Sequence, residues 1–395
     1  MNEPTNAPDT DALNRQMLNA VRETGLFLPP AIEHAFLDTP RHHFLPDLPL
    51  ADVYKDEAIA AQIAEDGVEW LSSSSQPTIM AIMLEQLGIE PGMRVLEIGT
   101  GTGYNAALLA KLTGSGEHVW TVDVTPHLCD EAEQHLRAAG VEGVHVSCGD
   151  GWLGWPEAAP FDRIIVTASA YDVAPAWFEQ LAEGGRLVLP WGAPMIGQRA
   201  MAFEKQGGAL VLTSSHTCGF MRLRGASDWQ GPSTEADEDR QSGRWEIPIG
   251  SGLPSPFTVL NEFLHFLSLF VWPLTPMLLV EDGTADGSKI HFADRRSRLT
   301  AHLSIGDTWT VSGSGGESFA ETVGDAVRQW FTWEQPAPER LAMTGWPRGQ
   351  APEVAAGERL ARREWFDYVV KTHPARAPAL PEREGEELQS GPNPL

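Results

Sequence analysis

Three glycines at alternate positions mark the part of this sequence best suited to hold a ligand. Gly99, Gly101 and Gly103 follow the short apolar segment 95–98 and precede the helix-forming run 106–110. Because glycine has no Cβ, it permits a tight turn and a close approach of backbone to a ligand. A strand, a glycine turn and a helix in this order bind a ligand at the helix N-terminus of a parallel α/β sheet.

The side chains around this turn favour S-adenosylmethionine over a dinucleotide. The spacing is G-x-G-x-G, whereas dinucleotide folds usually show G-x-G-x-x-G. Glu97 stands just before the first glycine, where it would repel a pyrophosphate but tolerate a sulfonium and an amino group. Asp123 ends the next expected strand, roughly 20 residues further on, where a carboxylate can bind both ribose hydroxyls.

Composition narrows the class of protein. The chain has 395 residues and a net charge of −26, so we expect two domains and no nucleic-acid substrate. Its three scattered cysteines form neither a disulfide scaffold nor a C-x-x-C metal site, and its polar, acidic start is unlike a signal peptide. We therefore expect a cytoplasmic protein. The apolar run 257–272 is too short to span a bilayer, so we expect a buried helix and no membrane contact.

The expected elements alternate between strands and helices. After two N-terminal helices, residues 72–76 are expected to be a loop, and Pro77 to begin a helix that ends at Gly88. The remaining expected elements are strands 95–98, 118–122, 144–147, 161–167 and 186–190, a helix 175–182, and a hairpin of 201–205 with 210–214. This order predicts a class I Rossmann-like methyltransferase fold, α/β, with a mostly parallel sheet and an antiparallel hairpin.

The composition changes after residue 225. Residues 226–245 are acidic and rich in loop formers, which predicts a linker. Beyond it we expect strands at 277–280, 289–292, 299–303 and 308–311, then helices at 318–333 and 358–370. The predicted division is therefore an N-terminal helical and lid region 1–75, a cofactor-binding domain 76–225, the linker 226–245, a small α+β domain 246–372 and a disordered tail 373–395.

Several segments together resemble the protein-L-isoaspartate O-methyltransferases, over roughly residues 15–225. They are PRHHFLP at 40–46, LEIGTGTGYNAALLA at 96–110, VDV at 122–124, GDGWLGWPEAAPFDRIIVTA at 149–168 and QLAEGGRLVLP at 180–190. The long pattern beginning with GDG is specific to that family, whereas the glycine turn is shared by all class I methyltransferases.

This resemblance implies methylation of the side-chain or α carboxylate of an altered aspartate in a peptide, with S-adenosylmethionine as donor. It implies that Asp123 holds the ribose and Asp150 the adenine amino group. The full set of expected cofactor residues is Glu97, Gly99, Thr100, Gly101, Gly103, Asp123, Val124, Gly149, Asp150, Gly151 and Thr167. The expected acceptor residues are Ser73, Ser74 and Ser75, although serine runs are also common as loops and helix caps.

One departure bears on the substrate. The family usually has T-I-S-A-P-H before the helix that precedes the glycine turn, and this chain has SSSQPT at 73–78. Ser75 matches the family serine, while Gln76 and Thr78 replace alanine and histidine. With the added C-terminal domain, the chain is similar to lanthipeptide-associated methyltransferases, which methylate an aspartate in a modified precursor peptide and lead to succinimide or isoaspartate. Eight of the 14 tryptophans lie from Trp229 onward, and we expect some of them to grip that peptide.

The chemistry requires few groups. A carboxylate with a pKa near 4 is already ionised at pH 7, so its methylation needs alignment and exclusion of water rather than a general base. Arg222 and Arg224 are candidate cations for the acceptor or ordinary surface arginines. His42 and His43 lack a third ligand, so no metal is expected.

Three other functions remain open: general isoaspartyl repair, a non-catalytic adaptor that binds S-adenosylmethionine, and an NAD oxidoreductase. Methylation assays with an isoaspartyl peptide distinguish the first, and cofactor titrations distinguish the other two.

Overall fold

The computed structural model describes residues 9–63, 70–192, 197–225, 242–247, 256–270, 274–280, 288–294, 300–304, 309–314, 325–326, 328–334 and 336–373. The tail expected after 373 and most of the expected linker lie outside these residues.

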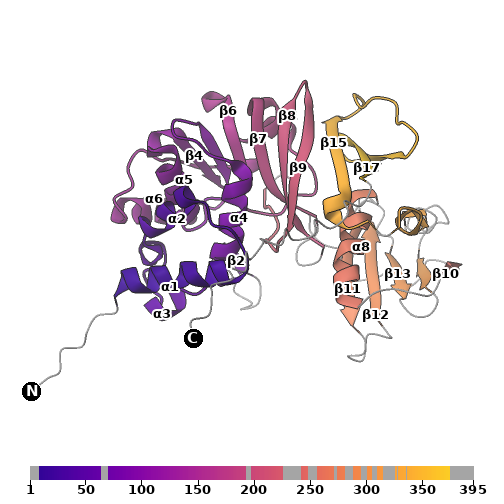
Figure 1. The fold of residues 1–395 in the computed structure, drawn as a ribbon, viewed down its shortest axis with the longest axis horizontal. Coiled ribbons are helices and arrows are strands. Elements are labelled where there is room, and N and C mark those ends of the chain that lie inside the picture. Colours follow the sequence, from indigo (N-terminus) through magenta and orange to yellow (C-terminus); the bar gives the residue numbers. More distant parts are fainter. Residues whose placement is uncertain are drawn as a thin grey trace, which may run out of the picture.

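A mostly parallel sheet occupies the centre of the described chain. Its parallel strands are β3 (Val95–Ile98), β4 (Val119–Asp123), β5 (His145–Cys148), β6 (Phe161–Val166) and β7 (Leu181–Trp191), followed by the antiparallel β8 (Arg199–Gln206) and β9 (Ala209–Thr217). They lie in the order β9-β8-β7-β6-β3-β4-β5. Figure 1 shows the sheet running from β4 to β9. This is the predicted Rossmann-like α/β fold with its antiparallel hairpin.

Helices cover both faces of this sheet. They are α1 (Thr10–Glu23), α2 (Pro30–Leu37), the 3-10 helix η1 (Arg41–Phe44), α3 (Leu50–Val53), α4 (Pro77–Leu87), α5 (Tyr104–Thr113), α6 (Pro126–Ala138) and α7 (Pro175–Gln180). Alternate residues of each strand point to opposite faces. In β7, for example, Val188 belongs to the same buried core as residues of α1, α4 and α5, while Leu187 and Leu189 belong to the core that contains Trp177 of α7.

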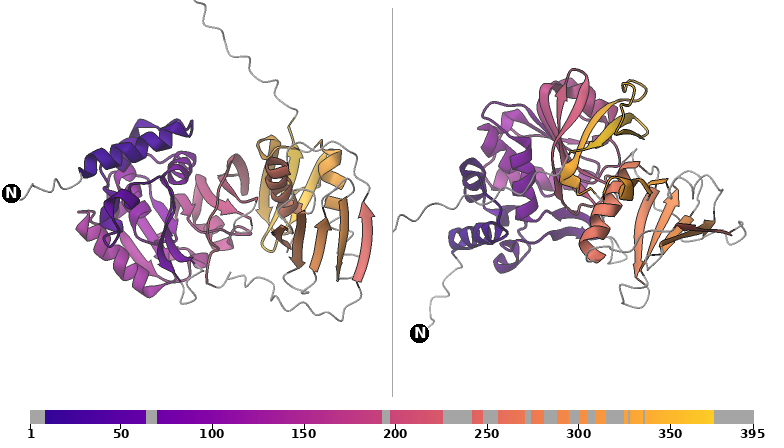
Figure 2. Two further views of the ribbon diagram at one scale, coloured as in Figure 1. Left: turned by 90° about the horizontal axis from the view of Figure 1, so that it is seen from below. Right: turned by 45° about the vertical axis from the view of Figure 1, so that its right-hand side comes forward.

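The last part of the chain extends the same sheet. β15 (Leu341–Pro347) pairs with β9, and β17 (Phe366–Thr372) and β16 (Glu358–Arg362) follow it outward. The helix predicted over 358–370 is therefore wrong. Its residues Glu, Arg, Leu and Ala favour a helix locally, but pairing with β15 buries the run 366–370 as a strand. Figure 2 shows these yellow strands beside the sheet.

A second, antiparallel sheet follows the central one. It is formed by β10 (Ser242–Ile247), β14 (Trp309–Ser314), β13 (Thr300–Ser304), β12 (Ser288–Asp294) and β11 (Leu274–Val280), in that order. The four strands predicted between 277 and 311 are confirmed. β10 begins inside the expected linker. The predicted domain 246–372 thus contributes strands to two different sheets.

The apolar run 257–272 forms the predicted buried helix, α8 (Pro256–Phe270). Phe263, Leu264 and Leu267 are buried in the same core as Trp191 of β7. Among the described residues, no helix is both long and apolar enough to cross a bilayer.

A buried carboxylate joins the C-terminal strands to the central sheet. Asp172, between β6 and α7, accepts a hydrogen bond from the Tyr368 hydroxyl at 3.0 Å and from the Trp365 amide at 2.9 Å. Arg363, also buried, donates to the carbonyl of Ser268 in α8. Burial raises the pKa of Asp172 to about 6. These bonds fix β17 and α8 against the parallel sheet.

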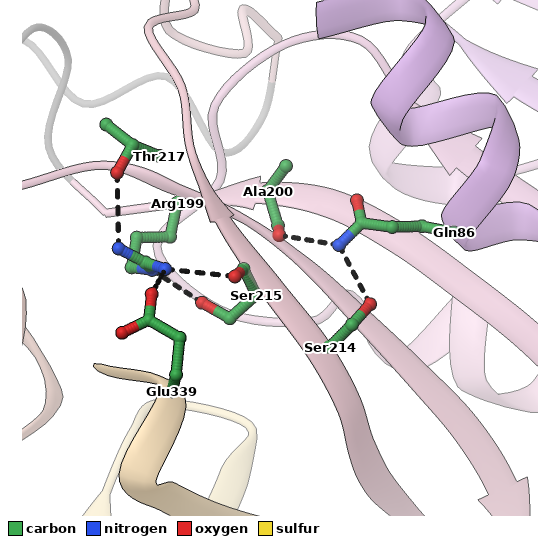
Figure 3. A network of polar contacts seen from close by, with 7 residues as sticks. All are labelled: Gln86, Arg199, Ala200, Ser214, Ser215, Thr217 and Glu339. Atoms are coloured by element: carbon green, nitrogen blue, oxygen red, sulfur yellow. Dashed lines mark hydrogen bonds and ion pairs between the residues drawn. The ribbon is translucent and has the colours of Figure 1, made fainter. Parts of the chain in front are cut away.

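Polar contacts also fix the β8–β9 hairpin on two sides (Figure 3). On one side, Gln86 of α4 donates to the carbonyl of Ala200 at 3.1 Å. On the other, Arg199 donates to the Ser215 carbonyl at 2.9 Å and pairs with Glu339 of η6 (Pro338–Arg340). The hairpin is therefore held between the N-terminal helices and the C-terminal segment.

Candidate functional site

A cavity of about 790 Å³ opens at the carboxyl ends of the parallel strands. Its wall includes Ile98 at the end of β3, Asp123 at the end of β4 and Thr167 just after β6. Ligands of open α/β sheets bind at this edge of the strands. The serine segment 72–75 and the segment 219–224 close the opposite side.

The three glycines of the turn all adopt a backbone conformation that favours glycine, and one of them also leaves no room for a side chain. Gly99, Gly101 and Gly103 have φ values of +103°, +51° and +86°, a region that favours glycine. A Cβ on Gly99 would lie 2.4 Å from Oγ1 of Thr167. That hydroxyl donates to the Gly99 carbonyl at 2.7 Å, so it also fixes the turn. Gly103 directly precedes α5, whose N-terminus therefore faces the cavity side of the turn.

Asp123 is positioned by backbone amides on both sides. One carboxylate oxygen accepts from the Gly101 amide at 3.1 Å and the other from the Thr125 amide at 3.0 Å. The residue is 8% exposed and lines the cavity. A carboxylate has about four acceptor sites, so two remain for hydroxyl groups such as those of a ribose. Val124, the next residue, lines the same wall and is 36% exposed.

Glu97 lies fully buried at the base of the cavity. It accepts hydrogen bonds from Nδ2 of Asn105 at 2.7 Å and from Oγ1 of Thr121 at 2.6 Å. Burial raises its pKa to about 7, and the two hydrogen bonds oppose this shift. Thr100 is buried beside it, with its hydroxyl 2.7 Å from that of Thr121.

The sequence prediction missed Asn105 and Thr121. For Thr121 the sequence did offer a signal, because it is the polar residue in the otherwise apolar strand 119–122.

The serine segment does not form the expected loop. Residues up to Ser74 belong to β2 (Trp70–Ser74), which pairs antiparallel with β1 (Ile59–Ile63). The prediction failed because serine favours loops locally, whereas pairing with β1 keeps the backbone extended. Ser73, Ser74 and Ser75 all line the cavity, and their role toward the acceptor stays a prediction.

Arg41 holds the serine segment in place. Its guanidinium is fully buried and donates to the carbonyls of Ser74 at 3.3 Å and Ser75 at 2.9 Å. It also donates to the carbonyls of Val53, Lys55 and Glu57 at 3.0–3.2 Å. Burial lowers the pKa of this guanidinium. The sequence prediction missed this role, because the bonds reach residues 33 and 34 positions away.

Asp56 fixes the start of α4. Its carboxylate accepts from Nε2 of Gln76 at 3.1 Å, and from the amide and hydroxyl of Thr78 at 2.8 and 2.6 Å. Gln76 and Thr78 are the residues that depart from the family pattern. In this structure their side chains bond to Asp56 and are not part of the cavity wall.

The GDG segment lies at the edge of the site. Of its residues, Gly151 is in the described cavity wall, and Gly149 and Asp150 are not. The Asp150 carboxylate accepts from the Trp152 amide at 2.9 Å and caps the 3-10 helix η3 (Gly151–Leu153). Contact of Asp150 with an adenine amino group therefore stays a prediction.

The paired histidines lie away from the main cavity. His42 and His43 line a separate hollow of about 520 Å³, and Nδ1 of His42 is 2.8 Å from the Tyr54 hydroxyl. The described residues contain no cluster of His, Cys, Asp and Glu suited to a metal ion.

The residues of the main cavity fit S-adenosylmethionine. The glycine turn leaves room for backbone contact, Asp123 offers acceptors for ribose hydroxyls, and Glu97 offers a carboxylate for the α-amino group of the methionine end. Fold and site together define the class of S-adenosylmethionine-dependent, Rossmann-like methyltransferases.

Comparison with known proteins places the chain within this class. The family model for protein-L-isoaspartate(D-aspartate) O-methyltransferase matches residues 12–228, more than half of the chain. The chain belongs to this family of carboxyl O-methyltransferases, which use S-adenosylmethionine.

Curated relatives and a solved structure agree with this assignment. A protein-L-isoaspartate O-methyltransferase of Thermotoga maritima is 42% identical over 182 residues, which are 46% of this chain and 56% of that protein. A protein-L-isoaspartate O-methyltransferase 1 of Nitrosospira multiformis is 37% identical over 56% of this chain and 91% of its own length. A solved protein-L-isoaspartate O-methyltransferase is 28% identical with a TM-score of 0.53, covering 84% of this chain and 96% of its own.

Proposed function

We propose that this protein methylates an aspartate or isoaspartate carboxylate in a ribosomally made, modified precursor peptide. The observation that carries the proposal is the closeness of the serine segment to the glycine turn. A Cβ on Gly101 would lie 3.6 Å from the Ser73 carbonyl and 3.7 Å from the Ser72 hydroxyl. An acceptor held by the serines therefore lies beside a donor held by the turn.

The chemistry at this point is a displacement on carbon. When bound, S-adenosylmethionine supplies a methyl group activated by its sulfonium. The carboxylate acceptor is already ionised at neutral pH, so this chain supplies no general base. Hydroxyl donors at Ser73 and Ser75 orient one carboxylate oxygen and leave the other free to attack. The surrounding wall, which includes Met80, Met83 and Phe220, excludes water from the reacting atoms.

From the sequence alone, the C-terminal extension beyond residue 228 favours a precursor peptide as substrate. The comparison with a solved relative weakens this support. The solved relative aligns with 84% of this chain, so a C-terminal segment also occurs in an enzyme named only for isoaspartate. What favours a distinct acceptor is the departure of this segment from the family pattern at Gln76 and Thr78, whose side chains bond to Asp56 at the start of α4. General isoaspartyl methylation is the second candidate function, supported by the names of the relatives.

Intact-mass spectrometry tests the proposal and separates it from repair. The full chain is incubated with S-adenosylmethionine and either a simple isoaspartyl peptide or candidate modified precursor peptides. We expect a gain of one methyl group on a precursor, followed by loss of methanol as a succinimide forms. Rapid methylation of the simple peptide alone would favour repair, and absence of turnover with retained cofactor binding would favour a non-catalytic adaptor. Methyl transfer to nitrogen would contradict all of these.

A further inference from the structure

The β1–β2 hairpin carries a pair of large, exposed apolar side chains. Ile63 and Trp70 are partners across the two strands. They are 48% and 43% exposed, respectively. Single exposed apolar residues are common on protein surfaces, but these two are neighbours, and Trp70 also lines the cavity.

This surface is continuous with the proposed acceptor site. Trp70 belongs to the wall of the same cavity as the serines. Trp70 begins β2, and the proposed acceptor residues Ser73 and Ser75 lie three and five positions further along the chain in the same cavity wall. A peptide that places a carboxylate at the serines thus passes beside the Trp70 indole, which offers a large apolar area at low conformational cost.

Two arginines in the cavity wall offer a contact for an anionic part of the same occupant. Arg222 and Arg224 are the only lysines or arginines among the described residues of its wall. Their segment is fixed by backbone hydrogen bonds between Ser169 and the residues on either side of Arg222, at 2.7 and 2.9 Å. The two arginines offer a local attraction for a carboxylate, while the acids of the same wall, Glu97 and Asp123, lie near the ends of β3 and β4.

We propose that Trp70, with Ile63, selects peptides that carry a large apolar side chain next to the methyl-accepting aspartate or isoaspartate. Trp70 is thus a specificity-determining residue, and the substrate class is a peptide with a carboxylate and an adjoining leucine-like or aromatic residue. The inference rests on the proposed carboxyl methyltransferase function and adds to it the nature of the neighbouring residue.

Steady-state kinetics with matched peptides tests this inference. The substrates are two isoaspartyl peptides and the two corresponding aspartyl peptides. Within each pair, one peptide has leucine and the other has glycine on both sides of the acceptor residue. For the wild-type chain we expect a KM at least about fivefold lower with leucine and a similar kcat. Trp70→Ala should remove that preference by raising the KM of the leucine peptides, whereas Trp70→Phe should retain most of it.

Phe27→Ala is the matched control, because Phe27 is 73% exposed and is not in the cavity wall. It should leave the preference unchanged, and titration with S-adenosylmethionine should show that every variant still binds the cofactor. If the wild type methylates both kinds of peptide equally, or if Trp70→Ala keeps the preference, the inference is overturned while the proposed function stands. If no peptide is methylated, the inference is overturned, and the intact-mass assay with modified precursor peptides decides the proposed function.

Discussion

At the scale of single residues, Glu97 is an acid enclosed beside the position expected for a cationic cofactor. Its pKa of about 7 means that its charge changes within the ordinary working range of an enzyme. The ionised form attracts the amino group and sulfonium of S-adenosylmethionine, and the protonated form does not. The affinity for the cofactor should therefore depend on pH through Glu97, and replacing an exposed acid of the chain should leave this dependence unchanged.

We expect the affinity for S-adenosylmethionine to rise as the pH increases through about 7, because Glu97 then ionises. If the bound cation lowers the pKa of Glu97 by one unit, the affinity gain is about tenfold, or about 1.4 kcal/mol. Calorimetric titrations at pH 6, 7 and 8 measure this. Glu97→Gln should bind more weakly at pH 8 and lose the pH dependence.

Glu85→Gln is the control, since Glu85 is exposed on α4. An unchanged pH dependence in Glu97→Gln would contradict the assignment.

The raised pKa of Glu97 also has a consequence for folding. A carboxyl whose folded pKa lies above its unfolded value stabilises the fold at low pH, and this contribution is lost as the pH rises through about 7.

Arg41 acts through the serine segment rather than on a ligand. A lysine at this position keeps the charge but cannot donate from a planar fork to several carbonyls at once. Arg41→Lys should therefore raise the peptide KM about tenfold or more and leave S-adenosylmethionine binding within about twofold. Arg22→Lys is the matched control, because Arg22 is 42% exposed and its ion pair with Glu33 lies far from the serines in sequence. Equal loss of cofactor and peptide binding in Arg41→Lys would indicate general unfolding instead.

At the scale of elements, the parallel strands, the glycine turn and the β8–β9 hairpin could be predicted because local sequence decides them. Gly207 and Gly208 form the hairpin turn, and short apolar runs flanked by loop residues form the strands. β16 and β17 could not be predicted, because β17 depends on pairing with β15, and β16 depends on pairing with β17. Likewise, the partners of Glu97 and Arg41 lie up to 34 residues away, so no local pattern reveals them.

The junction around Asp172 links three elements, and its removal should destabilise the fold. Asp172→Ala leaves the Tyr368 hydroxyl and the Trp365 amide without their acceptor in a buried site. We expect a loss of roughly 3 kcal/mol in the free energy of unfolding. Denaturant titration measures this, with Asp325→Ala as the control because Asp325 is exposed and pairs with Arg328 within a single helical turn. A change below about 1 kcal/mol would show that the junction contributes little.

At the scale of the whole molecule, one sheet contains strands from residues 12–228, which match the family model, and strands from the segment that follows. β15 hydrogen-bonds to β9 at Leu210 and Val211. Beyond β15, Tyr368 packs its ring against Trp191 and Phe203 of the central strands. The segment after residue 228 thus completes the core of the methyltransferase fold, whatever it contributes to peptide recognition.

This joined sheet has a consequence for any shortened form of the chain. Ending the protein at Gly225 would remove β15 and expose the edge of β9 at Leu210 and Val211, where β15 now pairs with it. Copies of the truncated form should associate through this exposed strand edge. Light scattering after size-exclusion chromatography would reveal concentration-dependent oligomers. Placing a lysine at Val211 should restore monodispersity to the truncated form. A monodisperse truncated form without that lysine would show that the exposed edge of β9 does not cause association.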